Sequence, residues 1–253
     1  MDPLECAVAT AKEAGLLLRE RVGLPLEMRE KAARGDLVTA SDRASEALIV
    51  ARLRAAFPSS TILAEERGTH PGTSDERWIV DPLDGTTNYA HDYPMYCVSI
   101  AYERAGEVVA AAVYAPALEE LYAGERGSGA TCNGKALRVS RTSCAAESLV
   151  CTGFKAADYE RNGARFARLS HIAQGVRRDG AAALDLAFVA AGRFEAFWEF
   201  DLQAWDVAAG ALLVREAGGR VTAIDGSRFV VAGGSILATN AYVHDEMRVA
   251  LEV

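Results

Sequence analysis

Two carboxylates follow a predicted strand in residues 78–88, which read Trp-Ile-Val-Asp-Pro-Leu-Asp-Gly-Thr-Thr-Asn. The first three residues are large or β-branched and suit a buried strand, whereas proline and glycine come soon after them, so we expect the strand to end at Asp81. Pro82 keeps the preceding residue extended, and Gly85 permits a sharp turn. Asp81 and Asp84 can therefore converge, and such a pair either holds a proton or binds a hard cation such as Mg²⁺.

The residues that follow the second aspartate have donors for an anion. The backbone amides of Gly85, Thr86 and Thr87, with two hydroxyl groups beside them, could form an anion-binding nest. A metal ion and a phosphate group are both compatible with this turn.

Glu65 stands in an acidic pair, Glu65-Glu66, at the end of a predicted strand over residues 61–63. Such a pair is usually a solvated loop. Only a polar loop over residues 69–77 separates this strand from the one that ends at Asp81. The two strands could therefore present three carboxylates to one cation.

Other candidate residues precede or begin predicted helices. Ser41 or Asp42 is typical of a helix N-cap before an apolar run. Asp206 lies in the first turn of a later helix, where an acid normally complements the helix dipole. Residues 180–182, Gly-Ala-Ala, approach another helix whose amides could face an anion or a hydroxyl group, although tight packing is the more usual reason for small residues.

The elements that must position these residues divide into two patterns. The first part has helices and then a β-meander, and from residue 149 strands alternate with helices. An extended segment over residues 26–30 and a polar loop over residues 31–39 lie between the first two helices. The predicted helices cover residues 4–21, 42–57, 159–172, 183–191, 205–216 and a terminal segment after residue 240; the predicted strands cover residues 61–63, 78–81, 96–102, 107–114, 120–124, 135–140, 149–152, 194–200 and 235–239.

Composition excludes several classes of protein. The net charge of −8 argues against a nucleic-acid binder, which needs a positive surface. The first residues lack the basic and apolar regions of a signal peptide, and the apolar runs are shorter than a membrane span, so we expect a cytoplasmic protein with no membrane association. The five cysteines are scattered without a Cys-x-x-Cys pair, which favours free buried thiols over a disulfide framework or zinc ribbon.

Taken together, these motifs resemble the inositol monophosphatase family of metal-dependent sugar-phosphate phosphatases over nearly the whole chain. The resemblance depends on residues 78–88 and on residues 205–210, Trp-Asp-Val-Ala-Ala-Gly, with Glu-Ala-Gly-Gly at 216–219. The Glu65-Glu66 pair and residues 36–42 also match. The resemblance implies an α+β or α/β fold built as a layered αβαβα sandwich, in a single unit over residues 1–253 with an N-terminal part to about residue 145 and a C-terminal part from about residue 146.

The resemblance also implies a homodimer that needs two or three Mg²⁺ ions and is inhibited by Li⁺. It makes the metal ligands Glu65, Asp81, the carbonyl oxygen of Leu83, Asp84 and Asp206. One ion would lower the pKa of the attacking water and a second would offset charge on the leaving oxygen.

The same resemblance assigns the remaining roles. Glu65 and Thr86 would orient the attacking water, and Asp42 would hold Thr86. The amides of Gly85 and Thr86 would bind phosphate oxygens. The ring hydroxyls would contact Asp84, Ala182 and Glu199.

Two departures from the family pattern concern the substrate side. Ala181 stands where many members have a hydroxyl residue, and Ala64 stands where a glycine is common. Neither removes a ligand, but the first could change sugar preference, as could Asp179 and Asp201 beside the pocket.

The leading hypothesis is hydrolysis of myo-inositol 1- or 4-monophosphate to inositol and phosphate by direct attack of water. Fructose-1,6-bisphosphatase or a broader sugar-phosphate phosphatase is the alternative within the same chemistry. A different class is a non-catalytic role in a transcription or ribosomal RNA complex, although the acidic balance argues against direct RNA contact. A structural Ca²⁺-binding protein is excluded because no contiguous 12-residue loop of alternating oxygen ligands is present.

Overall fold

The computed structural model describes residues 1–23, 29–30, 37–154 and 159–252. Most of the predicted extended segment 26–30 and polar loop 31–39 lies outside these residues. Between residues 26 and 39 the structure describes one short antiparallel pair of strands, β1 (Arg29–Glu30) with β2 (Leu37–Val38).

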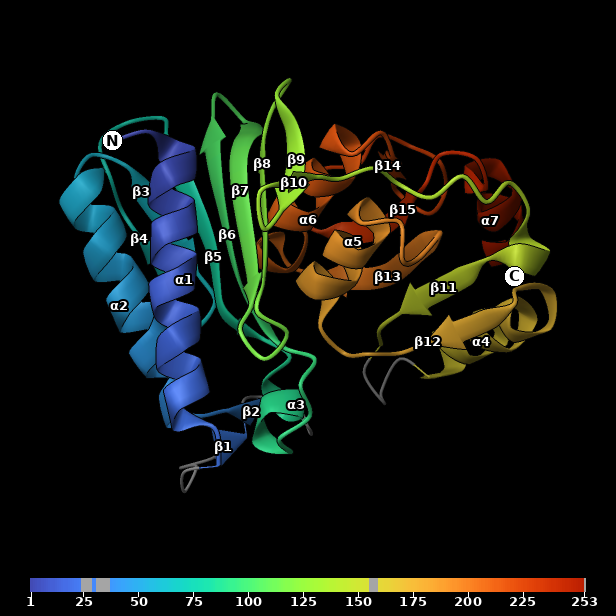
Figure 1. The fold of residues 1–253 in the computed structure, drawn as a ribbon, viewed down its shortest axis with the longest axis horizontal. Helices are drawn as coiled ribbons and strands as arrows, with labels where there is room; N and C mark the ends of the chain where they lie inside the picture. Colours follow the sequence, from blue (N-terminus) through green and yellow to red (C-terminus); the bar gives the residue numbers. More distant parts are fainter. Residues whose placement is uncertain (24–28, 31–36, 155–158, 253) are drawn as a thin grey trace.

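Over the described residues, two sheets and three helical layers alternate in the order helix, sheet, helix, sheet, helix (Figure 1). Helices α1 and α2 cover one face of the larger sheet, α5 and α6 lie between the sheets, and α4 and α7 cover the outer face of the smaller sheet. This arrangement confirms the predicted αβαβα sandwich. The helices are α1 (Pro3–Arg21), α2 (Ala40–Ala56), α3 (Thr86–Ala90), α4 (Tyr159–Ile172), α5 (Ala182–Ala190), α6 (Ala204–Glu216) and α7 (His244–Leu251), with a 3₁₀ turn at Ala145–Glu147.

The larger sheet has eight described strands in the order β10-β9-β8-β7-β6-β5-β3-β4, and the smaller has five in the order β12-β11-β13-β15-β14. β3 and β5 are parallel in the larger sheet, and β11 is parallel to both its neighbours in the smaller one. The strands are β3 (Thr61–Ala64), β4 (Gly68–His70), β5 (Arg77–Asp84), β6 (Cys97–Arg104), β7 (Glu107–Ala115), β8 (Glu120–Glu125), β9 (Gly129–Cys132), β10 (Lys135–Ala136), β11 (Leu149–Thr152), β12 (Gly175–Arg177), β13 (Ala196–Leu202), β14 (Arg220–Thr222) and β15 (Gly234–Thr239).

Strand β5 is buried on both faces because helices cover both sides of its sheet. Trp78 and Val80 belong to the core under α1 and α2, whereas Ile79 belongs to the core that contains α5 and α6. Alternate side chains of a strand point to opposite faces, so three consecutive apolar residues supply two cores. The core around α5 and α6 also contains residues of the smaller sheet, for which reason we propose that both parts of the chain fold as one unit.

The prediction that this strand ends at Asp81 is wrong, because β5 continues to Asp84. Asp81 pairs with Ser99 and Asp84 with Cys97, so three steps along β5 match two along β6. That offset is a β-bulge, which accommodates Pro82 within the strand. The bulge gives the segment between the two aspartates an irregular backbone.

Several short elements differ from the predictions. β10 ends at Ala136 rather than at residue 140, and β9 is not among the predicted strands. The sequence also does not predict β4, β12, β14 or α3, which have three to five residues each. Elements this short have too few residues to show a periodic pattern.

No helix among the described residues has the length and apolarity needed to cross a membrane. All five cysteines are free thiols. Cys6, Cys97 and Cys151 are buried, whereas Cys132 and Cys144 are only partly buried.

Candidate active site

The ends of two neighbouring strands place Glu65 beside Asp81. β3 and β5 run parallel with Ala64 opposite Val80. The amide of Glu65, the next residue, donates a hydrogen bond of 3.3 Å to the carbonyl of Val80. Because the two strands run parallel in this register, the residue after the end of β3 lies beside Asp81, the residue of β5 that follows Val80.

Asp81 lies at the centre of an acidic group. Its side chain is 2% exposed, and one carboxylate oxygen accepts a 3.0 Å hydrogen bond from the amide of Leu83. Burial raises the pKa of Asp81 well above its usual value, and the nearby charges of Glu65, Asp84 and Asp206 raise that pKa further. The structure therefore brings together four acids that the sequence places on three separate segments.

Asp84 connects this acidic group to the start of α5. Its Oδ2 atom accepts a 2.7 Å hydrogen bond from the amide of Ala183, and the Cys97 thiol lies 3.6 Å away. The N-cap residue of α5 is Ala181, which has no capping side chain, so Asp84 supplies the acceptor from another strand. Burial raises the pKa of Asp84 to about 7, although the hydrogen bond from Ala183 lowers it.

Asp206 caps its helix and also lies near the acidic group around Asp81. It lies in the first turn of α6, where its Oδ2 atom accepts a 2.6 Å hydrogen bond from the amide of Gln203. The same side chain is close enough to Asp81 to raise the pKa of that residue. Capping the helix thus fixes the carboxylate at the edge of the acidic group.

The predicted cap of α2 needs correction. Thr39 is the N-cap, and Asp42 is the third helical residue of a capping box in which its Oδ2 atom accepts a 2.8 Å hydrogen bond from the Thr39 amide. The Asp42 Oδ1 atom accepts a 2.9 Å hydrogen bond from the Thr86 hydroxyl. Burial raises the pKa of Asp42, whereas the hydrogen bonds from Thr39 and Thr86 lower it.

Two further residues of α2 hold the backbone around the acids, and sequence reasoning missed both. The Ser45 hydroxyl donates a 2.8 Å hydrogen bond to the carbonyl of Pro82, inside the bulge of β5. Glu46 is fully buried and accepts hydrogen bonds of 2.8 Å and 3.4 Å from the amides of Glu66 and Arg67. With Asp42 these residues have helical i, i+3, i+4 spacing on one buried face of α2, but the spacing alone does not distinguish this face from a solvated one.

Gly85 must be glycine at this position. It has φ 86° and ψ 37°, a left-handed conformation that side chains rarely adopt. An added Cβ atom would also lie 2.7 Å from the carbonyl oxygen of Met95. Helix α3 begins at the next residue, and amides in the first turn of a helix have no intrahelical acceptor. The Thr86 hydroxyl lies there, 3.1 Å from the Leu83 carbonyl oxygen.

The predicted substrate residues lie on the smaller sheet and on α5. Ala182 is the first residue of α5, and the half-buried Glu199 on β13 has its carboxylate directly against Gly153. Asn88, whose role the sequence did not indicate, donates 2.6 Å and 2.7 Å hydrogen bonds to the carbonyls of Met95 and Asp179. Asn88 thereby ties the turn after β5 to the segment that leads into α5.

The donor set fits Mg²⁺. The side chains of Glu65, Asp81, Asp84 and Asp206 supply carboxylate oxygens, and Leu83 can add a carbonyl oxygen. Hard cations prefer oxygen ligands of this kind. A dication would also relieve the repulsion that raises the pKa of the buried Asp81.

The chain resembles characterised proteins over almost its full length. It is 46% identical over 213 residues to an inositol-1-monophosphatase of Mesorhizobium japonicum, an alignment that covers 83% of this chain and 80% of the relative. It is 44% identical over 252 residues to the Nus factor SuhB of Pseudomonas aeruginosa, which covers 95% and 92% of the two chains.

Solved structures share the fold. The extragenic suppressor protein suhB of Bartonella henselae superposes with a TM-score of 0.95 at 39% identity and covers 98% of this chain and 97% of that one. An IMPase/NADP phosphatase complexed with Mg²⁺ and phosphate superposes with a TM-score of 0.84 at 26% identity and covers 96% and 92%.

The family model of inositol monophosphatases matches residues 2–252. This match and the relatives at 46% and 44% identity show that the chain belongs to the inositol monophosphatase family, a family of phosphatases.

Proposed function

We propose that the chain hydrolyses a phosphate monoester, myo-inositol 1- or 4-monophosphate, with the help of Mg²⁺ and by direct attack of water. The observation that carries this proposal is the buried Asp81, whose pKa is raised by burial and by the charges of three other acids. Such a group of acids beside the left-handed turn at Gly85 provides for a cation and a phosphate in one place.

Glu65, Asp81, the Leu83 carbonyl, Asp84 and Asp206 would hold two or three Mg²⁺ ions. When bound, Mg²⁺ offsets the charge of the phosphate and of the leaving oxygen and makes water a better nucleophile. The amides of Gly85, the N-cap of α3, and of Thr86, its first residue, would bind phosphate oxygens.

The hydroxyl of Thr86 would orient the attacking water. Its proton is directed to Asp42 or to the carbonyl of Leu83, at 2.9 Å and 3.1 Å, which leaves oxygen lone pairs to accept a hydrogen bond from water. Asp42 is itself fixed by Thr39, so the Thr86 hydroxyl cannot rotate freely. Glu65, half-buried beside Asp81, would accept the second hydrogen bond of the water.

The sugar would lie between the acidic group and the smaller sheet. Asp84 accepts the Ala183 amide through Oδ2, and its Oδ1 atom would contact a metal ion or a hydroxyl. The amide of Ala182 and the carboxylate of Glu199 would contact ring hydroxyls, as the family resemblance implies. These contacts select a polyol and leave the phosphate chemistry unchanged.

A panel of phosphate esters tests the substrate. We expect phosphate release from inositol 1-phosphate that requires Mg²⁺, decreases with Li⁺, and is faster than release from fructose 1,6-bisphosphate. Faster release from fructose 1,6-bisphosphate would make a bisphosphatase or a broad sugar-phosphate phosphatase the better assignment.

Single substitutions test the metal ligands. Asp81→Asn and Asp206→Asn should each abolish turnover with the fold intact, whereas Asp75→Asn, at an exposed acid, should leave it unchanged. Retained activity in either ligand variant would refute the assignment. A single turnover in ¹⁸O-water should label the released phosphate, and unlabelled phosphate would exclude direct attack by water.

A second candidate function is a role in a transcription complex, which the relative named Nus factor SuhB favours. The net charge of −8 argues for a protein partner rather than direct contact with RNA. Pull-down with the intact chain should retain RNA polymerase subunits if this role exists, and their absence would exclude it.

We also propose that the chain forms a homodimer, as the family resemblance implies. Sedimentation equilibrium should give twice the mass of one chain. A monomer at micromolar concentration would contradict the proposal.

A further inference from the structure

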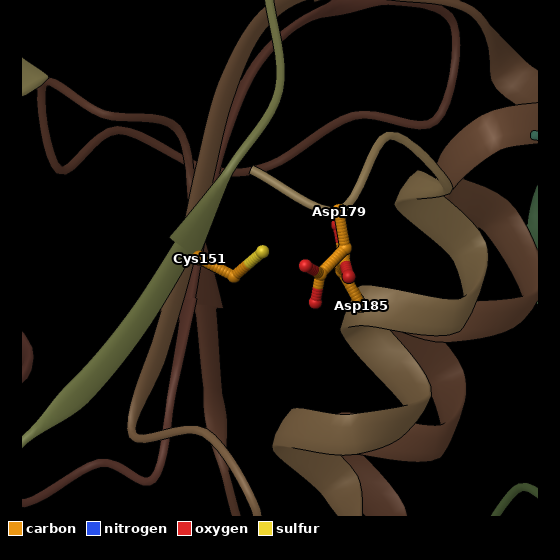
Figure 2. A group of neighbouring side chains, drawn as sticks. All are labelled: Cys151, Asp179 and Asp185. Carbon is orange, nitrogen blue, oxygen red and sulfur yellow. The ribbon is translucent and has the colours of Figure 1, made fainter. Parts of the chain in front are cut away.

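A thiol and two carboxylates converge outside the acidic group around Asp81. Among the described residues, the Cys151 sulfur and one carboxylate oxygen each from Asp179 and Asp185 lie within 4.8 Å of one another. Figure 2 shows that Cys151 points from its strand toward the two aspartates. Cys151 is on β11, Asp179 follows β12, and Asp185 is on α5, so three separate elements supply the cluster.

Asp185 is the residue of this cluster that points to a bound cation. Its side chain is 1% exposed, and among the described residues neither carboxylate oxygen has a nitrogen or oxygen hydrogen-bond partner; the Cys151 thiol is the polar group beside it. A buried carboxylate without a partner is unfavourable by several kcal/mol, roughly, unless a proton or a cation neutralises it. One oxygen of Asp185 lies within 4.8 Å of both the Cys151 sulfur and an Asp179 oxygen.

The electrostatics of the cluster favour a positively charged occupant. Burial and the charge of Asp179 raise the pKa of Asp185 well above its usual value. Burial and the charge of Asp185 likewise raise the pKa of the Cys151 thiol. Asp185 and Cys151 are thus disfavoured as anions, which is the situation that a bound dication relieves; burial also raises the pKa of Asp179, although the charge of Arg177 lowers it.

We propose that Cys151, Asp179 and Asp185 bind one Zn²⁺ ion, with a water molecule in the fourth position. Zn²⁺ accepts sulfur and oxygen ligands in tetrahedral geometry, with bonds of about 2.3 Å to sulfur and about 2.0–2.2 Å to oxygen. Ligand atoms in such a site are about 3.3–3.7 Å apart, so the three ligand atoms, which lie within 4.8 Å of one another, would approach by up to about 1 Å on binding.

The ligand set separates this site from that of Mg²⁺. Mg²⁺ prefers oxygen ligands alone, whereas a thiolate favours Zn²⁺ and similar transition metals. Binding replaces the protons that the Cys151 thiol and the buried Asp185 hold, because the pKa of each is raised. It forms one metal–sulfur and two metal–oxygen bonds and releases the thiol proton and the Asp185 proton to solvent.

The position of the site connects it to the substrate side. The ion would join β11 to the first turn of α5, the helix that begins at Ala182 and whose Ala183 amide donates a hydrogen bond to Asp84. Burial and the charge of Asp179 are the main causes of the raised pKa of Asp185, and the charges of Asp84 and Glu199 raise it further. The Zn²⁺ ion would thereby fix the start of α5, where the substrate hydroxyls are proposed to bind.

Metal analysis of the intact protein tests the site independently of catalysis. The chelator-treated protein is given excess Mg²⁺, which occupies the oxygen-only site, and is then titrated with Zn²⁺. We expect one Zn²⁺ retained per chain after gel filtration and release of about two protons on binding at neutral pH. No retained Zn²⁺ would overturn the proposal and leave Asp185 as a buried protonated acid.

Cobalt substitution identifies the ligands. Co²⁺ bound by a thiolate gives a sulfur-to-metal charge-transfer band in the near ultraviolet, which carboxylates cannot produce. Cys151→Ser should abolish this band, and the matched variants Cys132→Ser and Cys97→Ser should keep it. A band that survives Cys151→Ser, or that disappears only in Cys97→Ser, would place the metal elsewhere and overturn the proposal.

The aspartates are tested by affinity. Loss of a residue that only hydrogen-bonds to a metal ligand lowers metal affinity by about 10–100-fold. Loss of a ligand itself, in Asp185→Asn or Asp179→Asn, should therefore lower the affinity for Zn²⁺ by at least about 100-fold. Asp179 is half-buried in the segment before α5, so its variant should fold even if changes at the two buried ligands prevent folding. Unchanged Zn²⁺ affinity in Asp179→Asn would overturn the three-ligand site.

Discussion

Replacing Asp84 by asparagine should stabilise the metal-free protein at alkaline pH. Asp84 is 8% exposed, and burial raises its pKa from 3.8 to about 7. A difference of about three pH units corresponds to roughly 4 kcal/mol of unfavourable free energy for the ionised form in the folded state. Asparagine keeps an oxygen for the Ala183 amide but loses about 1 kcal/mol of charge-assisted hydrogen bonding. The net gain should be about 3 kcal/mol.

The pH dependence follows from the direction of the pKa change in Asp84. Because the folded pKa is raised, the folded protein holds this proton more tightly than the unfolded chain. The wild type should therefore lose stability relative to Asp84→Asn as pH rises from about 4 to about 7, and the difference should be complete above about pH 7.

The assay is thermal and urea unfolding of both proteins in a chelating buffer at about pH 4.5 and about pH 8. At the higher pH the melting temperature of Asp84→Asn should exceed that of the wild type by roughly 6–12 °C, since 1 kcal/mol shifts it by about 2–4 °C in a chain of this size. Saturating Mg²⁺ at about 100 times its dissociation constant should stabilise the wild type by about 2.7 kcal/mol and the variant much less. Equal melting temperatures at about pH 8, or the same gain at both pH values, would refute the reasoning.

Three further variants test how the backbone and the acids are held. Gly85→Ala should destabilise the protein by about 2–4 kcal/mol in urea unfolding, because φ is positive and the new Cβ would lie 2.7 Å from the Met95 carbonyl oxygen. Thr86→Val should lower kcat at least about 100-fold because the hydroxyl bonded to Asp42 is lost, whereas Thr86→Ser should retain most activity in the same steady-state assay. Glu46→Ala should raise the Mg²⁺ concentration for half-maximal activity about 10–100-fold, with a smaller effect on kcat. Recovery in Glu46→Gln would show that the acceptor atom matters. An unchanged Mg²⁺ requirement would contradict a positioning role.

The sequence was sufficient to predict the family, the layered fold and the strand that leads to Asp81. Long apolar runs have strong periodicity, and the motifs around Asp81 and Asp206 are specific. The end of that strand was not predictable, because β5 continues past Pro82 only where β6 pairs with it across a bulge. Local residue preferences contain no information on this pairing.

The supporting residues were also outside the reach of the sequence. Ser45 and Glu46 look like ordinary polar residues of a helix, and only their burial shows that they bind the backbone beside the acids. Cys151 and Asp185 are 34 positions apart with no ligand spacing between them, and they meet only because α5 packs on the sheet that contains β11. Tertiary packing, and not local pattern, creates these contacts.

The most direct test of the central claim is the anomalous scattering of Mn²⁺, used in place of Mg²⁺, in crystals grown with phosphate. The account predicts at least one strong anomalous peak bounded by the carboxylates of Asp81, Asp84 and Asp206, with phosphate density at the amides of Gly85 and Thr86. Crystals that show Mn²⁺ bound elsewhere, with no peak among these carboxylates, would contradict it.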